Sequence, residues 1–128
     1  MDLLLDTNIL LWSRITPERL GAAAQTLLTS PDNRLFFSIA SLWEISIKRS
    51  LNRPDFTVDP ALLLRDLLAN DYQELGISSA HTLAVMSLPW LHRDPFDRIL
   101  IAQANIEGLL LVTADSTIAR YPGPIKRI

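Results

Sequence analysis

The stretch Leu3-Leu4-Leu5-Asp6-Thr7-Asn8 places an acid and two polar residues directly after three leucines. An apolar run without alternation is typical of a short strand that is buried on both faces. Leu35-Phe36-Phe37 and Leu109–Val112 are further runs of this kind. Such strands occur in parallel sheets that helices cover on both sides. The opening stretch therefore predicts a buried parallel strand that ends at Asp6.

Helical patterns alternate with these strands along the chain. Ser38 and the pair Asp59-Pro60 are typical helix starts, and Gly108 is a typical helix end. We expect strands at residues 3–5, 35–37, 72–75, 109–112 and, weakly, 124–127. We expect helices at 7–14, 18–29, 38–50, from 60 onward, and at 78–87, 95–107 and 115–120. This order predicts an α/β fold whose functional site lies at the carboxyl ends of the strands.

The composition excludes several classes of protein. The 128 residues are of the size of one domain, and we expect 1–128 to form a single one. The absence of cysteine excludes disulfides, thiolate nucleophiles and zinc–cysteine sites, and two histidines argue against a multi-histidine centre. The N-terminal residues lack the features of a signal peptide, and no apolar stretch approaches the ~20 residues that span a bilayer. We therefore expect a cytoplasmic protein with no membrane segment.

Five acidic residues fall where the predicted elements would bring acids together. Asp6 and Asp115 each follow the carboxyl end of a strand, and Asp94 and Asp97 open a helix that leads back to a strand. Glu44 lies inside an apolar helix. Carboxylates repel one another, so such a cluster usually requires a cation, for which a divalent metal with oxygen ligands is suited. The pattern indicates metal-assisted phosphodiester chemistry.

Each acid also has a structural explanation. Asp6 and Asp115 could cap the helices that follow them, and Asp94 with Asp97 makes a good capping arrangement. Glu44 could form an ion pair with Lys48 one helical turn later. These alternatives stay open for each acid taken singly. It is less plausible that all five acids have only structural roles than that they share one site.

The basic residues suggest a phosphate-bearing ligand. Without the five acids, 9 of the 14 acidic residues remain against 12 bases, of which ten are arginine, the side chain best shaped for phosphate. Lys48, Arg93 and Arg98 are the candidates for phosphate contacts, although a solvated surface also explains any one of them. His92 is close to the acids and could orient a phosphate. His81 and the tryptophans at 12, 43 and 90 are expected to serve packing.

Four stretches of the chain resemble the motifs of the PIN domain. They are Leu3-Leu4-Leu5-Asp6-Thr7-Asn8, Ser41-Leu42-Trp43-Glu44-Ile45, Asp94-Pro95-Phe96-Asp97-Arg98-Ile99-Leu100-Ile101-Ala102-Gln103-Ala104 and Leu111-Val112-Thr113-Ala114-Asp115. The resemblance covers the whole chain. Within this family, the chain is similar to the single-domain VapC-type toxins of bacterial toxin–antitoxin pairs. It implies a three-layer α/β/α fold with a five-stranded parallel sheet in the order 3-2-1-4-5.

The resemblance also implies an activity, a cofactor and partners. It implies an endoribonuclease that depends on Mg²⁺ or Mn²⁺ and leaves 5′-phosphate and 3′-hydroxyl ends. It implies a homodimer and an antitoxin that blocks the site. The family's four acids correspond to Asp6, Glu44, Asp97 and Asp115, with the metal on Asp6, Asp97 and Asp115 and with Glu44 as a ligand or a group that orients water. The additional site residues are Asp94, Thr7, Asn8 and Thr113.

Other functions remain open at this point. An aspartyl-phosphate phosphatase would need an acid two residues after its nucleophile, where this chain has Asn8. A receiver domain would need an acid after the third strand, but Leu75-Gly76-Ile77 supplies none. A catalytically inactive binding module with a PIN fold is compatible with every residue named above.

Overall fold

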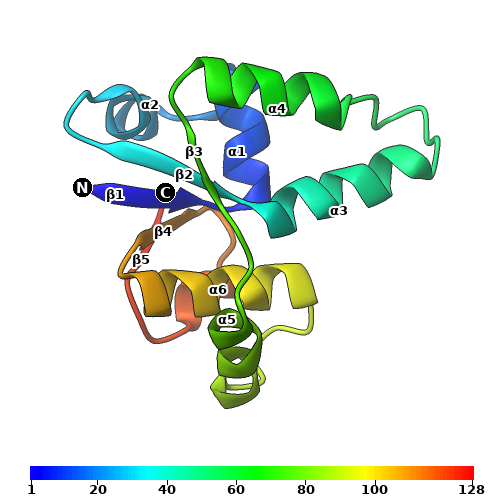
Figure 1. The fold of residues 1–128 in the computed structure, drawn as a ribbon. Helices are drawn as coiled ribbons and strands as arrows, with labels where there is room; N and C mark the ends of the chain where they lie inside the picture. The colour runs from blue at the N-terminus through cyan, green and yellow to red at the C-terminus, as the bar shows by residue number, and fades with distance from the viewer.

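The computed structural model describes residues 1–128, and its elements form three layers (Figure 1). One sheet contains β1 (Asp2–Leu5), β2 (Arg34–Ser38), β3 (Gln73–Leu75), β4 (Leu110–Thr113) and β5 (Ile125–Arg127). The strand order is β3-β2-β1-β4-β5, and each neighbouring pair is parallel. The predicted fold class and strand order are therefore confirmed.

Six α-helices surround the sheet, and Figure 1 shows α1, α2 and α4 on one side of it and α5 and α6 on the other. They are α1 (Thr7–Arg14), α2 (Ala22–Thr29), α3 (Ile39–Ser50), α4 (Pro60–Ala69), α5 (Ser79–Ala84) and α6 (Pro95–Glu107). Short 3₁₀ helices are η1 (Pro17–Arg19), η2 (Val85–Ser87) and η3 (Ile118–Arg120). None of these helices has the length and apolar character to cross a membrane.

The three leucines of β1 form the centre of two hydrophobic cores. Leu3 and Leu5 belong to the core beneath α1, α2 and α4, whereas Leu4 belongs to the core that α6 covers. All three side chains are completely buried. Each contributes about 1.5–3 kcal/mol of hydrophobic stabilisation, by the usual value for a buried leucine. The prediction of a strand buried on both faces is thus confirmed.

Two predicted helices have different bounds in the structure. The helix expected at 18–29 is divided into η1 and α2, because Leu20 and Gly21 have extended backbones, with ψ angles of 133° and 166°. Leu20 is thereby buried in the core. The helix expected at 115–120 is only η3, because the Asp115 side chain accepts from Thr117 and Ile118 and forms a capped turn first.

The central position of β1 creates a crevice at its carboxyl end. β1 pairs with β2 on one side and with β4 on the other, so the strand order reverses there. The Asp6 N–H donates to the Val112 carbonyl at 3.1 Å and extends the pairing past the end of β1. Ligands of open parallel sheets bind at such a reversal point. The fold therefore places Asp6 and the end of β4 where a site is expected.

Candidate active site

A polar cavity of about 260 Å³ opens at the carboxyl ends of β1 and β4. All five acids that the sequence singled out line this cavity: Asp6, Glu44, Asp94, Asp97 and Asp115. Thr7, Asn8, Lys48, His92 and Ile118 complete the lining. The fold thus brings together acids from distant parts of the chain, as predicted.

Asp6 is buried, with 4% of its surface exposed, and both of its carboxylate oxygens are engaged. Oδ1 accepts from the Ile9 N–H at 2.8 Å and caps α1, while Oδ2 accepts from the Thr113 hydroxyl at 2.5 Å. Burial raises the pKa of Asp6 from 3.8 to about 6, and these two hydrogen bonds offset part of the rise. The negative charges of Asp115 and Glu44 raise it further.

Thr113 links Asp6 to Asp115. Its hydroxyl accepts from the Asp115 N–H at 3.0 Å while it donates to Asp6, and its side chain is completely buried. Asp115 uses Oδ1 to accept from the Thr117 N–H at 2.7 Å, which leaves Oδ2 toward the cavity and 3.7 Å from His92 Nε2. The predicted site role of Thr113 therefore rests on direct contacts with two acids.

Asp94 and Asp97 stand at the start of α6 and have different environments. Asp94 caps the helix by accepting from the Phe96 N–H at 2.8 Å, so its predicted capping function is confirmed. Asp97 has one oxygen 2.9 Å from His92 Nε2. Burial, followed by the charge of Asp94, raises the pKa of Asp97 from 3.8 to about 7, while His92 opposes this rise.

His92 contributes more to the site than the sequence indicated. Its ring nitrogen forms a group with carboxylate oxygens of Asp97 and Asp115 in which all three atoms lie within 4.8 Å of one another. The only sequence signal was its place two residues before Asp94. By contrast, His81 is a buried structural residue, as expected: it completes the cap of α5 and lies 2.9 Å from Glu107.

Glu44 enters the cavity from α3 and is 9% exposed. Its Oε2 lies 3.2 Å from Lys48 Nζ, so the predicted ion pair is present. Its Oε1 is buried and has no hydrogen-bond partner in the protein. The Thr7 hydroxyl donates to Ser41 at 2.9 Å and ties α1 to α3 near this point. The ion pair therefore accounts for only one of the two oxygens of Glu44.

The residues of the cavity fit a divalent cation. Glu44 Oε1 and His92 Nε2 are buried atoms without hydrogen-bond partners, and both belong to residues that line the cavity. For His92, the short distance to Asp97 does not have the angle of a hydrogen bond. The other atoms of the cavity that could bind a metal are carboxylate oxygens, the ligands that hard divalent cations prefer. A cation would also offset the mutual repulsion that raises the pKa values of Asp6 and Asp97.

The three predicted phosphate-binding bases occupy different positions. Arg93 is exposed, and a shallow pocket at the cavity's rim is lined by Arg93 and Lys48 together. Arg98 is only 3% exposed and donates to backbone carbonyls, among them that of Pro89 at 2.9 Å. This position contradicts the predicted phosphate contact of Arg98, because its donors are used within the protein. Arg93 and Lys48 remain accessible.

Two tryptophans expected to serve packing are more exposed than a packing function requires. Trp43 is 58% exposed and makes an edge contact with Phe96, with ring centroids 5.0 Å apart. Trp90 is 79% exposed and has the Arg98 guanidinium 4.1 Å from its ring centroid.

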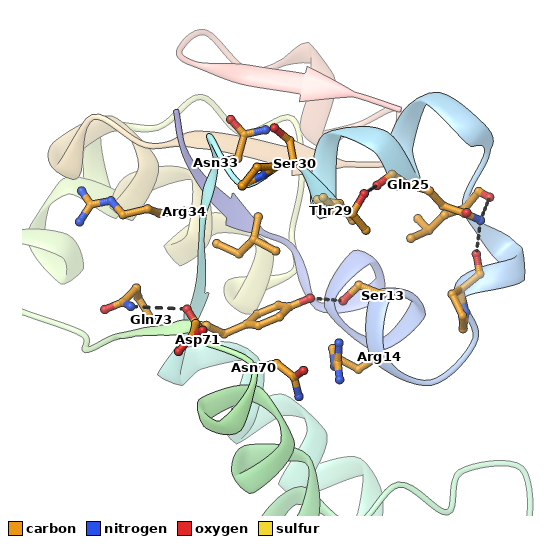
Figure 2. Close-up of a pocket in the computed structure, with 16 residues that line it drawn as sticks. Ser13, Arg14, Gln25, Thr29, Ser30, Asn33, Arg34, Asn70, Asp71 and Gln73 are labelled. Carbon is orange, nitrogen blue, oxygen red and sulfur yellow. Dashed lines mark hydrogen bonds between the residues drawn. The ribbon is translucent and has the colours of Figure 1, made fainter.

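A larger cavity, of about 660 Å³, lies at the amino ends of β2 and β3, at the opposite edge of the sheet from the acids (Figure 2). Ser13 meets the Tyr72 hydroxyl across it at 3.2 Å. Both arginines of its lining are paired, Arg14 with Asp66 and Arg34 with Asp2, each at 2.6 Å. This cavity offers no unpaired arginine to a ligand, and the acidic cavity remains the candidate site.

The chain is similar to known proteins in sequence and in fold. Ribonuclease VapC22 of Mycobacterium tuberculosis is 29% identical over 125 residues, with 95% of each chain covered. The solved structure of VapBC2 from Rickettsia felis, bound to a DNA fragment from the promoter, has a TM-score of 0.74 at 19% identity and covers 99% of this chain and 98% of that chain. A toxin–antitoxin complex from Klebsiella pneumoniae has a TM-score of 0.62 at 19% identity and covers 98% of this chain and 99% of that chain. Residues 3–124 match the PIN domain, and the chain therefore belongs to the PIN domain family.

Proposed function

We propose that this chain is a metal-dependent endoribonuclease that hydrolyses RNA phosphodiester bonds and acts as the toxin of a toxin–antitoxin pair. The observation that carries this proposal is the convergence of five carboxylates in one cavity at the carboxyl ends of the central strands. Membership of the PIN domain family and similarity to a protein named as a ribonuclease support RNA as the substrate.

Asp6, Asp97 and Asp115 would hold the cation, which we take to be Mg²⁺ or Mn²⁺. When bound, the cation supplies positive charge at the phosphate and makes water a better nucleophile. Glu44 has a carboxylate oxygen that no protein donor uses, so it is placed to accept a hydrogen bond from the attacking water. Thr113 fixes one oxygen of Asp6 through its hydroxyl. Asp94, Thr7 and Asn8 shape the cavity around these groups.

Lys48 and Arg93 would guide the RNA backbone to the acids. Both line the shallow pocket at the rim, and both are exposed, so an RNA phosphate can approach them from the solvent. Contacts of this kind position a nucleic acid without reading its sequence. We therefore expect binding of RNA to weaken with salt, as it does wherever basic side chains replace the counterions of phosphates.

The proposed partners are an antitoxin protein and a second copy of this chain. The Klebsiella pneumoniae neighbour is a toxin–antitoxin complex, and its fold matches this chain over nearly the whole length. An antitoxin that inserts a basic side chain among the five acids would neutralise them and block the cavity at once. We propose the homodimer on the resemblance to VapC-type toxins.

The test is incubation of the purified chain with total RNA, with Mg²⁺, with Mn²⁺ and with a chelator. We expect RNA fragments with 5′-phosphate ends in the presence of either ion and intact RNA with the chelator. Binding of RNA without cleavage under all conditions would favour the inactive binding module. Hydrolysis of p-nitrophenyl phosphate without cleavage of RNA would favour the phosphatase.

A further inference from the structure

A further cavity, of about 290 Å³, lies on the face of the sheet that α1 and α2 cover. Its lining comes from α1, η1, α2 and β5 and from Ala114, the residue that follows β4. Most of this lining is apolar, and Trp12 supplies its one aromatic ring. Trp12 packs against the core beneath α1, as expected, but it is only half-buried. The cavity therefore offers an apolar and aromatic surface to a ligand.

Three cationic residues surround this cavity, and no acidic side chain lines it. They are Arg19, Lys126 and Arg127, all of them exposed, and none forms an ion pair. The Arg19 guanidinium carbon lies 5.6 Å from the centroid of the Trp12 ring, within the range of a cation–π contact. Lys126 is the β5 partner of Val112, so it lies on the face of the sheet that carries the core beneath α1. The cavity thus combines an aromatic ring with unpaired positive charge.

The end of β4 connects this cavity to the acidic one. Ala114 lines it, while the residues on either side of Ala114 belong to the acidic site: Thr113 donates to Asp6, and Asp115 lines the acidic cavity. Ile128, which also lines it, donates from its backbone N–H to the Thr113 carbonyl at 2.9 Å. A polynucleotide with one phosphate at the acids therefore has a neighbouring nucleotide within reach of this cavity.

We propose that this cavity binds one nucleotide of the single-stranded RNA substrate, next to the linkage that the acids cut. Bases stack on aromatic rings and on arginine guanidinium planes, and Trp12 and Arg19 supply one of each. Lys126 supplies positive charge for an adjoining phosphate. An acidic protein segment would satisfy the cations but would leave the stacking surface unused. The inference rests on the proposed function, because the nucleotide is taken as part of the RNA that the acids cut.

The other cavities lack one half of this combination. The cavity at the amino ends of β2 and β3 has both of its arginines in ion pairs. An apolar cavity beside Trp43 and Phe96 has no charged residue in its lining. The pocket beside Trp12 is therefore the one that offers both a stacking surface and free cations.

The fluorescence of Trp12 tests the proposal directly in a full-length chain that carries Trp43→Phe and Trp90→Phe. Both replaced side chains are exposed, so Trp12 becomes the sole tryptophan at little cost to the fold. The probe is an adenosine decaribonucleotide, added in a chelator so that nothing is cleaved. A base that stacks on the indole quenches it, and we expect saturable quenching that weakens with salt. Binding of the probe without a change in Trp12 fluorescence would overturn the proposal.

Two further ligands distinguish the occupants. Adenosine monophosphate should quench Trp12 far more weakly than the decanucleotide, because it lacks the contacts at the acidic site and the rim. Poly-glutamate should leave the fluorescence unchanged. Equal quenching by the mononucleotide would assign the cavity to free nucleotides, and quenching by poly-glutamate alone would assign it to an acidic protein segment. Either result would overturn the proposal.

The affinity for the labelled decanucleotide, measured by anisotropy at physiological salt, tests the side chains. Trp12→Ala should weaken binding by about 5- to 100-fold, the usual cost of losing one stacked base, and Trp12→Phe should retain most of the affinity. The double variant Arg19→Gln with Lys126→Gln should lose at least about 5-fold.

Arg53→Gln with Arg65→Gln is the matched control, because it removes two exposed cations elsewhere, and at this salt such distant charges are screened within about 8 Å. We expect this control to bind as wild type does. Equal losses in the two double variants, or wild-type affinity in Arg19→Gln with Lys126→Gln, would overturn the proposal even if Trp12→Ala does not fold.

These readouts separate the cavity from the proposed function, because binding in a chelator requires no cleavage. Quenching of Trp12 and the expected variant pattern in a protein that cleaves no RNA with Mn²⁺ would refute the ribonuclease and retain the nucleotide site. Cleavage of RNA by a protein whose Trp12 fluorescence and variant affinities do not respond would retain the ribonuclease and overturn the nucleotide site.

Discussion

Two carboxylates of the site cap a helix or a turn with one oxygen and face another side chain of the site with the second oxygen. Asp6 caps α1 through Oδ1 and accepts from Thr113 through Oδ2. Asp115 caps a turn through Oδ1, and its Oδ2 lies toward His92. Capping and a role in the site are therefore compatible at one residue. A cap also fixes the carboxylate, which reduces the entropy lost when a cation binds.

The raised pKa values of Asp6 and Asp97 predict how stability depends on pH. Their values are about 6 and about 7 in the folded protein, against 3.8 when unfolded. Between these values the folded state binds more protons, so the free energy of unfolding should fall as the pH rises from about 4 to about 7. The lowered pKa values of Asp2 and Asp66 act below this window.

Urea unfolding across this pH range, in the presence of a chelator, measures the effect. Asp97→Asn removes one of the two groups and should make the fall shallower, with higher stability at neutral pH. A free energy of unfolding that rises between these pH values would contradict the account of the metal-free site.

Glu44 and Lys48 allow a second test at single residues. If the ion pair were the whole role of Glu44, the loss of either side chain should lower cleavage equally and only mildly, since the lysine of the pair is exposed to solvent and such pairs are worth under ~1 kcal/mol. We expect instead that Glu44→Gln lowers RNA cleavage by at least about 100-fold, as loss of a group that handles the water's proton does. Lys48→Met should have a much smaller effect. The cleavage rates of the two variants at saturating Mn²⁺ distinguish these possibilities. Equal, mild losses in both would mean that Glu44 has only a structural role.

At the scale of elements, the segment between α5 and α6 depends on Arg98. This side chain on α6 donates to the carbonyls of Val85, Leu88 and Pro89 and stacks under Trp90. The segment has little regular structure of its own beyond η2. One buried guanidinium therefore replaces the hydrogen bonds that a helix or strand would supply.

Arg98→Met should destabilise the fold by roughly 3 kcal/mol, because it leaves several partly buried carbonyls without donors. The exposed Arg93 is the matched control: Arg93→Met should keep the stability and weaken RNA binding. Thermal melts and salt-dependent RNA binding of both variants provide the measurement. Arg98→Met with wild-type stability and weakened RNA binding would restore the phosphate contact that the sequence suggested.

The element pattern shows which parts of the fold the sequence could predict. The start of α6 at Asp94-Pro95 and its end at Gly108, with φ of 68°, follow from local conformational preferences, and both were predicted. The break at Leu20 and Gly21 depends on burial of Leu20 against a core built from distant segments, which no local signal reveals. The bounds of long elements were therefore predictable, and the breaks set by tertiary packing were not.

The same distinction applies to the site. The acids were predictable because strand ends and helix starts of a parallel sheet meet at one edge. The burial of Arg98 was not, since its partners Val85 and Tyr121 lie 13 and 23 residues away in sequence. The place of His92 among the acids depends on a segment without regular structure and on a hydrogen bond from the backbone of Asp94, so its position in the sequence alone gave only a weak hint.

At the scale of the whole molecule, the sheet separates two polar regions. The five acids occupy the carboxyl edge, whereas the larger cavity, whose arginines form ion pairs, occupies the amino edge. Without a cation, the carboxyl edge concentrates negative charge and reduces the stability of the fold. Binding of a cation there should therefore stabilise the entire domain.

Thermal melts with increasing Mn²⁺ measure this coupling. An ion that binds only the folded state adds about 2.7 kcal/mol when its concentration is about 100 times its Kd, so the melting temperature should rise. Asp6→Asn should melt above wild type without metal, because it removes a buried charge, and should respond less to Mn²⁺. A wild-type melting temperature that is constant up to millimolar Mn²⁺ would argue against a cation site.

The most direct test of the central claim is the single-turnover rate of cleavage of one defined RNA at saturating Mn²⁺. Wild type is compared with Asp97→Asn, Asp115→Asn and the off-site control Asp55→Asn, whose carboxylate is exposed in a loop. We predict that the two site variants remain folded and lose at least about 100-fold in rate, while Asp55→Asn matches wild type. Wild-type rates in folded Asp97→Asn and Asp115→Asn, or undiminished cleavage in a chelator, would contradict the claim that this acidic cavity cuts RNA.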